Sequence, residues 1–210
     1  QTETWFKGLD RIYNNFVYDF LYPNPASVLA FIENHDTDRF LGEGDNLPML
    51  KQASPLLLTP RRIPQLYYGT EIMMDGVKSK RAGYVRKDFP GGWTGDTETA
   101  LTAAGRSKIQ NECYNFYKTL LNWRKGNDVI AKGSMVQFMV QNGVYAYARQ
   151  HEGKTVFVML NGTDAETTVP LKFYKEILKD SKQGKDILSG KTVAFGESLT
   201  KGPRESLVIE

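Results

Sequence analysis

The first half of the chain alternates between helical and strand-like patterns of apolar residues. Spacings of three and four predict an amphipathic helix whose apolar face holds Trp5, Leu9, Ile12, Phe16 and Phe20. Prolines at 23 and 25 end this pattern. Continuous apolar runs at 28–32 and 64–69 predict short strands buried on both faces, with a second helix over 47–58 between them. Helix, strand, helix and strand at these separations predict a parallel α/β unit.

The second half of the chain changes its period from about 3.6 to about 2. A third helix is predicted over 109–123 and ends near Gly126. Beyond it, turn signals such as Asn142-Gly143 and Asn161-Gly162 separate short strand-like runs at 135–140, 144–149, 155–160, 165–169, 191–195 and 206–209. This pattern predicts an antiparallel β-sandwich. The boundary falls between 126 and 134, so we divide the chain into 1–130 and 131–210.

Composition excludes several classes of protein. The 210 residues hold 27 Lys and Arg against 24 Asp and Glu, and a net charge of +3 is too small to indicate a nucleic-acid or acidic-membrane partner. No apolar run is long enough to span a bilayer. The single Cys113 excludes an intramolecular disulfide and is predicted to be an inert buried thiol. The start, Gln1 to Phe6, does not resemble a signal peptide, and its helical pattern suggests a piece of something longer.

The strongest candidate for chemistry is Asn34-His35-Asp36, at the carboxyl end of the first predicted strand. Such strand ends are where α/β enzymes place catalytic groups. A solvated strand end is the competing interpretation. His35 and Asp36 reach one site only if the strand has already ended, because neighbours in a strand face opposite sides. A metal site made of His35, Asp36 and Asp38 matches no common ligand spacing.

Other features have plain structural interpretations. Tyr67 and Tyr68 are predicted to be core aromatics. Trp93, in the long irregular segment 73–101, either stacks on a sugar or base or anchors the loop. A lysine-rich stretch over 172–185 is interpreted as a solvated face.

Two motifs and their order resemble the α-amylase family of glycoside hydrolases. Phe31 to Asp36 is similar to that family's last catalytic motif, at barrel strand seven, and Ile63 to Glu71 is similar to its strand-eight signature. The run from Asp88 to Trp93 is most similar to the neopullulanase/cyclomaltodextrinase branch. The resemblance implies the last strands and helices of a (β/α)8 barrel followed by a C-terminal antiparallel β-sandwich, within a retaining enzyme for starch fragments, pullulan or cyclodextrins.

The resemblance also implies roles for residues. Asp36 corresponds to the third catalytic carboxylate and His35 to the histidine that assists it, both binding sugar hydroxyls more strongly in the transition state. Asn34 and Arg39 are expected to bind substrate, with Arg39 also orienting the loop. The partner implied is an α-glucan, without nucleic acid or membrane. No cofactor is implied for these residues, although calcium is possible in the parent protein, which is expected to be exported or periplasmic.

The nucleophile and the acid/base of such enzymes come from strands that precede these motifs, and nothing in this sequence matches them. The chain is therefore expected to be inactive alone. Because two barrel strands leave open edges, its first half is expected to be completed by the missing N-terminal part, to pair with another copy, or to be poorly ordered. Arg62, where the family usually has glycine, is expected to strain the entry to the second strand. The alternative function is a non-catalytic carbohydrate-binding or structural module.

Overall fold

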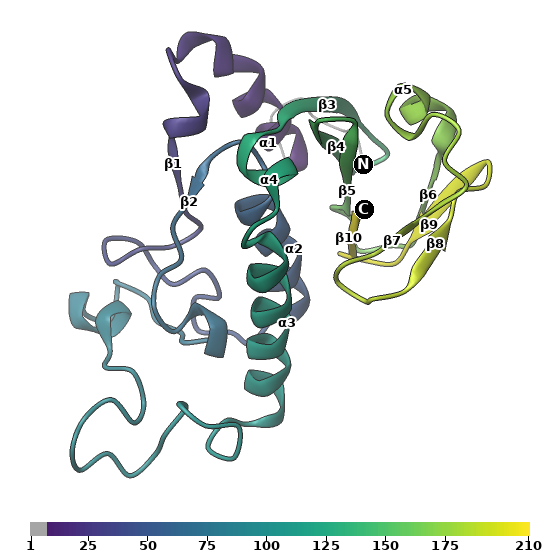
Figure 1. Ribbon diagram of the computed structural model, residues 1–210. Helices are drawn as coiled ribbons and strands as arrows, with labels where there is room; N and C mark the ends of the chain where they lie inside the picture. Colours follow the sequence, from purple (N-terminus) through teal and green to yellow (C-terminus); the bar gives the residue numbers. More distant parts are fainter. Residues whose placement is uncertain (1–7) are drawn as a thin grey trace.

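The computed structural model describes residues 8–210 (Figure 1). Helix α1 (Leu9–Val17) continues into a 3₁₀ turn, Tyr18–Leu21, before the prolines. The predicted first helix is thus confirmed from Leu9 onward, while Trp5 lies outside the described residues. Leu9 and Ile12 pack on the main sheet, whereas Phe20 is largely exposed.

A parallel pair of very short strands follows, formed by β1 (Leu29–Ala30) and β2 (Ile63–Pro64). The predicted parallel pairing is confirmed, but the prediction that both strands are buried on two faces is wrong. Leu29 and Ile63 are 52% and 50% exposed. The reason is that each strand has one neighbour among the described residues, so little covers its other edge and faces.

Helices α2 (Leu47–Leu58) and α3 (Lys108–Arg124) pack together at the centre of the molecule (Figure 1). Both predicted helices are confirmed. Ser107 and Gln110 form a reciprocal capping box at the start of α3. The segment 73–101 between the helices is irregular, as predicted, apart from a 3₁₀ turn at Ala82–Arg86.

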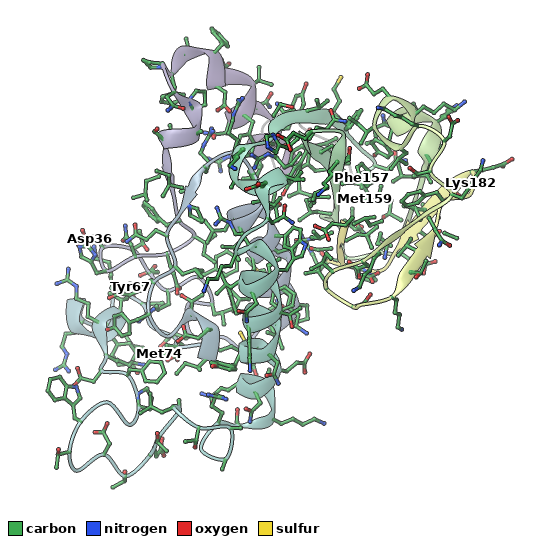
Figure 2. The ribbon with its side chains drawn as sticks, in the orientation of Figure 1. Asp36, Tyr67, Met74, Phe157, Met159 and Lys182 are labelled. Atoms are coloured by element: carbon green, nitrogen blue, oxygen red, sulfur yellow. The ribbon has the colours of Figure 1, made fainter. Side chains whose placement is uncertain are left out.

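The C-terminal part is built on a four-stranded antiparallel sheet in the order β10-β5-β4-β3. Its strands are β3 (Ser134–Gln141), β4 (Val144–His151), β5 (Lys154–Asn161) and β10 (Ser206–Ile209). Phe157 and Met159 face one core with two β-ribbons (Figure 2), and Tyr145 and Val158 face the other core with α1. Burial of both faces explains why β4 is apolar from Val144 to Ala148.

The two ribbons complete a sandwich-like arrangement. They pair β6 (Thr167–Pro170) with β9 (Ser198–Lys201) and β7 (Gln183–Lys185) with β8 (Thr192–Ala194). The antiparallel prediction is confirmed, but β7, β9 and the short helices α4 (Asp128–Lys132) and α5 (Lys175–Leu178) were not predicted. The predicted turn signal Asn161-Gly162 follows the end of β5 but does not join two paired strands, since β6 pairs with β9.

Buried hydrogen bonds join the helical part to the sheet. The hydroxyls of Thr59 and Tyr147 lie 2.6 Å apart, and the guanidinium of Arg149 donates to the carbonyl of Thr59 at 2.8 Å. The helices and one parallel strand pair of the first part do not by themselves show a barrel. Within 8–210, no helix combines the length and apolar character that a membrane crossing requires.

Candidate functional site

His35 and Asp36 lie together on the loop that follows β1. The strand ends at Ala30, so the alternation of strand side chains does not separate them. Nε2 of His35 lies 3.2 Å from Oδ2 of Asp36, and the two side chains are 57% and 65% exposed. Asp36 is at the outer surface of the helical part (Figure 2). The pair is therefore accessible to a ligand from solvent.

The long segment after β2 reaches back to this loop through Lys78 and Arg86. Arg86 donates from Nη2 to Oδ1 of Asp36 at 3.0 Å and from Nε to the carbonyl of His35 at 2.9 Å. Lys78 donates from Nζ to the carbonyl of Asp36 at 2.8 Å. Sequence reasoning did not assign these two cations, because no spacing links them to residues that lie 42 to 51 positions earlier. Arg86 thus holds Oδ1 of Asp36 while His35 lies beside Oδ2, and Lys78 holds the backbone of Asp36.

Asn34 shapes the turn that carries the pair. Its side-chain oxygen accepts from the backbone N–H of Asp36 at 2.8 Å, while its own N–H donates to the hydroxyl of Thr37 at 3.0 Å. These bonds replace the strand ladder as soon as the strand ends. Asn34 is half-buried, and its side-chain oxygen holds the turn in place through the bond to Asp36.

Beneath the loop, Glu33 and Arg39 form a buried ion pair at 3.3 Å. Arg39 also donates to the carbonyl of Tyr68 at 2.8 Å, and its guanidinium lies 4.0 Å from the ring centroid of Tyr67. The other oxygen of Glu33 accepts from the N–H of Phe40 at 2.5 Å. The structure thus places Arg39 under the loop and ties the ends of both strands together.

Arg39 and Gly76 link the two loops through the backbone. The N–H of Arg39 donates to the carbonyl of Gly76 at 2.9 Å. Gly76 has φ +155°, and a Cβ there would come within 2.5 Å of the carbonyl oxygen of Tyr84. Only glycine therefore fits this close approach.

The remaining residues singled out in the sequence differ in how far they are buried. Tyr67 is half-buried, and burial, with Tyr68 beside it, raises the pKa of its phenol. Trp93 is 67% exposed and so does not anchor its loop. Cys113 is fully buried, and burial raises the pKa of its thiol to about 12.

Arg62 is not strained: its φ is not positive, and its buried side chain pairs with Asp19. In the part of the chain described, no three His, Cys, Asp or Glu residues gather as a metal would need.

Comparison with known proteins relates most of the chain to one group of enzymes. Residues 135–210 match the family model described as the cyclo-malto-dextrinase C-terminal domain. The chain is 30% identical over 195 residues to an α-amylase from Niallia circulans, covering 89% of this chain and 33% of that protein. It is 30% identical over 207 residues to a cyclomaltodextrin glucanotransferase from Thermoanaerobacterium thermosulfurigenes, covering 95% of this chain and 26% of that one. The chain thus spans a third or less of these relatives.

Solved structures show the same fold. An α-amylase from Anoxybacillus superposes with a TM-score of 0.76 at 20% identity, over 97% of this chain and 42% of that one. An α-amylase from Geobacillus thermoleovorans, solved as a complex with acarbose, superposes with a TM-score of 0.74 at 22% identity, over 96% of this chain and 43% of that one.

Proposed function

The chain belongs to the α-amylase family, and from this premise we propose that it is part of a retaining enzyme that acts on α-linked glucans. The observation that carries the proposal is the exposed His35–Asp36 pair, held from below by Glu33 and Arg39 and from the side by Arg86. A carboxylate and an imidazole 3.2 Å apart can accept and donate hydrogen bonds to neighbouring hydroxyls of one sugar ring.

In this proposal Asp36 binds hydroxyls of the sugar whose bond is cleaved, and His35 donates beside it. Hydrogen bonds of this kind strengthen as the ring distorts toward an oxocarbenium ion, so they lower the barrier. Asn34 and Arg39 support the site, Asn34 by shaping the turn and Arg39 by anchoring it from below. Arg39 acts as a positioning residue, because its side chain has no exposed surface.

We further propose the domain division 1–130 and 131–210, with the first part contributing the last strands of a (β/α)8 barrel. The parallel β1–β2 pair and its helices support this, as does the family match that starts at Met135. Retaining hydrolysis needs a nucleophile and an acid/base about 5–5.5 Å apart. We assign neither to this chain, so we expect it to bind glucans without cleaving them. The branch is proposed to be cyclomaltodextrinase or neopullulanase.

The test is activity of the proposed parent enzyme on cyclodextrin, pullulan and soluble starch, with product analysis to separate hydrolysis from transfer. Asp36→Asn should lower kcat by about a hundredfold or more, the scale of losing a transition-state hydrogen bond to a charged group. Asp45→Asn is the matched control, because Asp45 is an exposed aspartate in the next loop. An unchanged kcat in Asp36→Asn excludes the assigned role.

The second candidate is a non-catalytic carbohydrate-binding module, favoured by the exposed ring of Trp93. Aromatic rings bind sugar faces by stacking. Trp93→Ala would then abolish binding of maltotriose by the chain alone and leave Asp36→Asn without effect. The reverse pattern supports the first proposal.

A further inference from the structure

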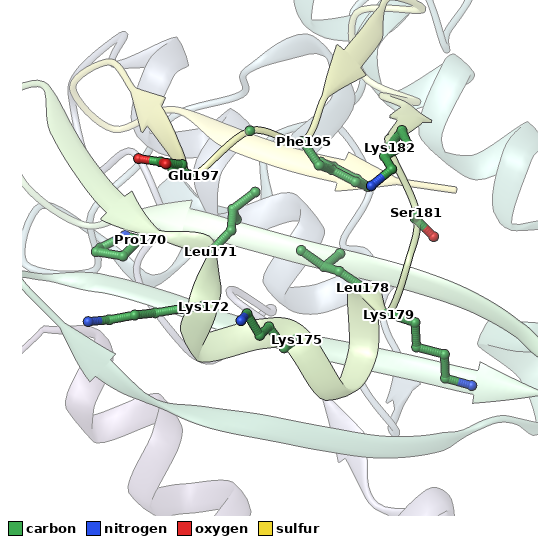
Figure 3. Close-up of a pocket in the computed structure, with 11 residues that line it drawn as sticks. Pro170, Leu171, Lys172, Lys175, Leu178, Lys179, Ser181, Lys182, Phe195 and Glu197 are labelled. Atoms are coloured by element: carbon green, nitrogen blue, oxygen red, sulfur yellow. The ribbon is translucent and has the colours of Figure 1, made fainter.

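Two groups of cationic side chains in the described chain differ in whether they converge on one partner. A cavity of about 510 Å³ in the C-terminal part is lined by four of the lysines that sequence analysis interpreted as a solvated face. All four are exposed, and Figure 3 shows Lys172 and Lys179 pointing to opposite outer sides, so that interpretation is confirmed for them. On the loop after β1, in contrast, Lys78 and Arg86 both bind one residue, Asp36.

The segment 76–87, which carries these two cations, is fastened to the loop after β1. The N–H of Gly76 donates to the carbonyl of Gly42 at 2.7 Å. The N–H of Lys78 donates to Oδ1 of Asp38, also at 2.7 Å. The path of the segment is therefore set by the loop that holds the candidate site.

Arg86 is held in place by both of its neighbours in the chain. Val85 has no exposed surface, so it anchors the segment in the interior. The carbonyl of Lys87 accepts from the hydroxyl of Tyr68 at 2.7 Å, and Nζ of Lys87 donates to Oδ1 of Asp75 at 2.8 Å. With anchors on either side, the backbone of Arg86 has a defined position from which its side chain reaches Asp36.

The guanidinium of Arg86 binds two different parts of the candidate site. Nε donates to the carbonyl of His35 at 2.9 Å, and Nη2 donates to Oδ1 of Asp36 at 3.0 Å. These two donors belong to one planar, rigid fork, so a single cation ties the backbone of His35 to the carboxylate of Asp36. The rotation of the carboxylate fixed in this way brings Oδ2 to 3.2 Å from Nε2 of His35.

We propose that Arg86 is a positioning residue for the glucan reaction, which holds the Asp36 carboxylate in the rotation where Oδ2 and His35 face the same sugar ring. This inference rests on the proposed function. The side chains of Arg86 and Asp36 are 50% and 65% exposed, and an ion pair of that kind contributes little to folding. Loss of Arg86 therefore leaves the chain folded but lets the carboxylate turn. Because its bonds to the sugar strengthen in the transition state, the loss falls on kcat and not on KM.

The experiment measures kcat and KM of Arg86 variants of the proposed parent enzyme on soluble starch. Arg86→Ala should lower kcat about tenfold, the scale of one hydrogen bond to a charged group, and leave KM within about twofold. Arg86→Lys should recover only part of the loss, since it keeps the charge without the fork. Guanidinium chloride at low millimolar concentration should raise kcat of Arg86→Ala, because the free cation can occupy the vacated place, and should not raise kcat of Asp36→Asn.

Arg81→Ala is the matched control, because Arg81 is an exposed arginine in the same segment, and it should leave kcat unchanged. If Asp36→Asn leaves kcat unchanged, the proposed function fails and the role of Arg86 fails with it. If Asp36→Asn lowers kcat while Arg86→Ala behaves like Arg81→Ala, or guanidinium restores nothing, only the role of Arg86 is overturned. A drop in kcat matched by a lower unfolding temperature in circular dichroism would make Arg86 a structural residue and overturn its positioning role as well.

Discussion

Arg39 and Glu33 are charged side chains buried beneath the candidate loop. Each neutralises the charge of the other, so the stability of the loop depends on both. Neither has appreciable exposed surface, and Nε and Nη2 of Arg39 have no hydrogen-bond partner among the described residues. Burying an unpaired charge costs far more than exposing it. The pair therefore fixes the loop at some cost in stability.

We predict that Arg39→Met lowers the free energy of unfolding by about 3–5 kcal/mol, because it leaves the Glu33 carboxylate buried without its cation. Urea denaturation measures this. Lys51→Met is the control: it breaks a partly exposed pair with Glu112 and should cost about 0–1 kcal/mol. The double variant Arg39→Met with Glu33→Gln should recover most of the loss. If the double variant is as unstable as Arg39→Met alone, the buried charge of Glu33 is not the cause of the lost stability.

Cys113 provides a prediction about pH. Burial raises its thiol pKa to about 12, above the ordinary value of 9.0. The unfolded chain therefore releases this proton at lower pH than the folded chain, so the thiol's contribution to stability is complete below about pH 9 and falls as pH rises toward 12. At pH 8, iodoacetamide should modify Cys113 only after unfolding in urea. Rapid labelling of the folded chain would contradict this.

The residues of the candidate site differ in how far sequence could identify them. Asn34, His35 and Asp36 are adjacent in the chain, so one pattern contains them all. Lys78 and Arg86 join them through a loop whose path no local pattern encodes. Arg62 could not be interpreted from local sequence either, because its partner Asp19 is 43 positions away. The side chain that was expected to strain the second strand instead forms a buried ion pair.

At the scale of elements, α3 begins with the capping box between Ser107 and Gln110. Ser107→Ala should lower the free energy of unfolding by about 1 kcal/mol, because the N–H of Gln110 loses its acceptor. Ser79→Ala is the matched control, as Ser79 is exposed in the irregular segment and should change stability by less than about 0.5 kcal/mol. Equal effects of the two changes in urea denaturation would show that the cap does not stabilise α3.

Elements with a clear period were predicted well, and elements defined by a distant partner were not. Helix α2 and strand β10 have the predicted bounds. Strands β7 and β9 are short and polar, and they exist because β8 and β6 lie beside them. The runs that form β1 and β2 predicted longer buried strands, but burial depends on neighbours that a local pattern cannot supply.

At the scale of the whole molecule, many of the exposed large apolar side chains of the described residues lie in the segment that leads to β1 and β2. They occur from α1 to β2 and include Val17, Tyr18, Phe20, Leu21, Tyr22, Leu29, Phe31 and Ile63. Exposed apolar patches and open strand edges mark surfaces that bind another chain. The large buried cores lie instead in the sheet and between α2 and α3.

This asymmetry predicts how the isolated chain behaves. Phe20 and Leu21 are 76% and 65% exposed, so the chain should self-associate in sedimentation equilibrium and bind a hydrophobic dye. Phe20→Ser with Leu21→Ser should shift it toward the 23.8 kDa monomer without loss of the sheet's circular dichroism. The control pair Leu101→Ser with Met139→Ser changes apolar residues that are 62% and 55% exposed elsewhere on the molecule, and it should leave the association unchanged. A cooperative wild-type monomer that binds no dye would show that the β1–β2 surface needs no partner, and the proposed barrel assignment of residues 1–130 would lose its physical basis.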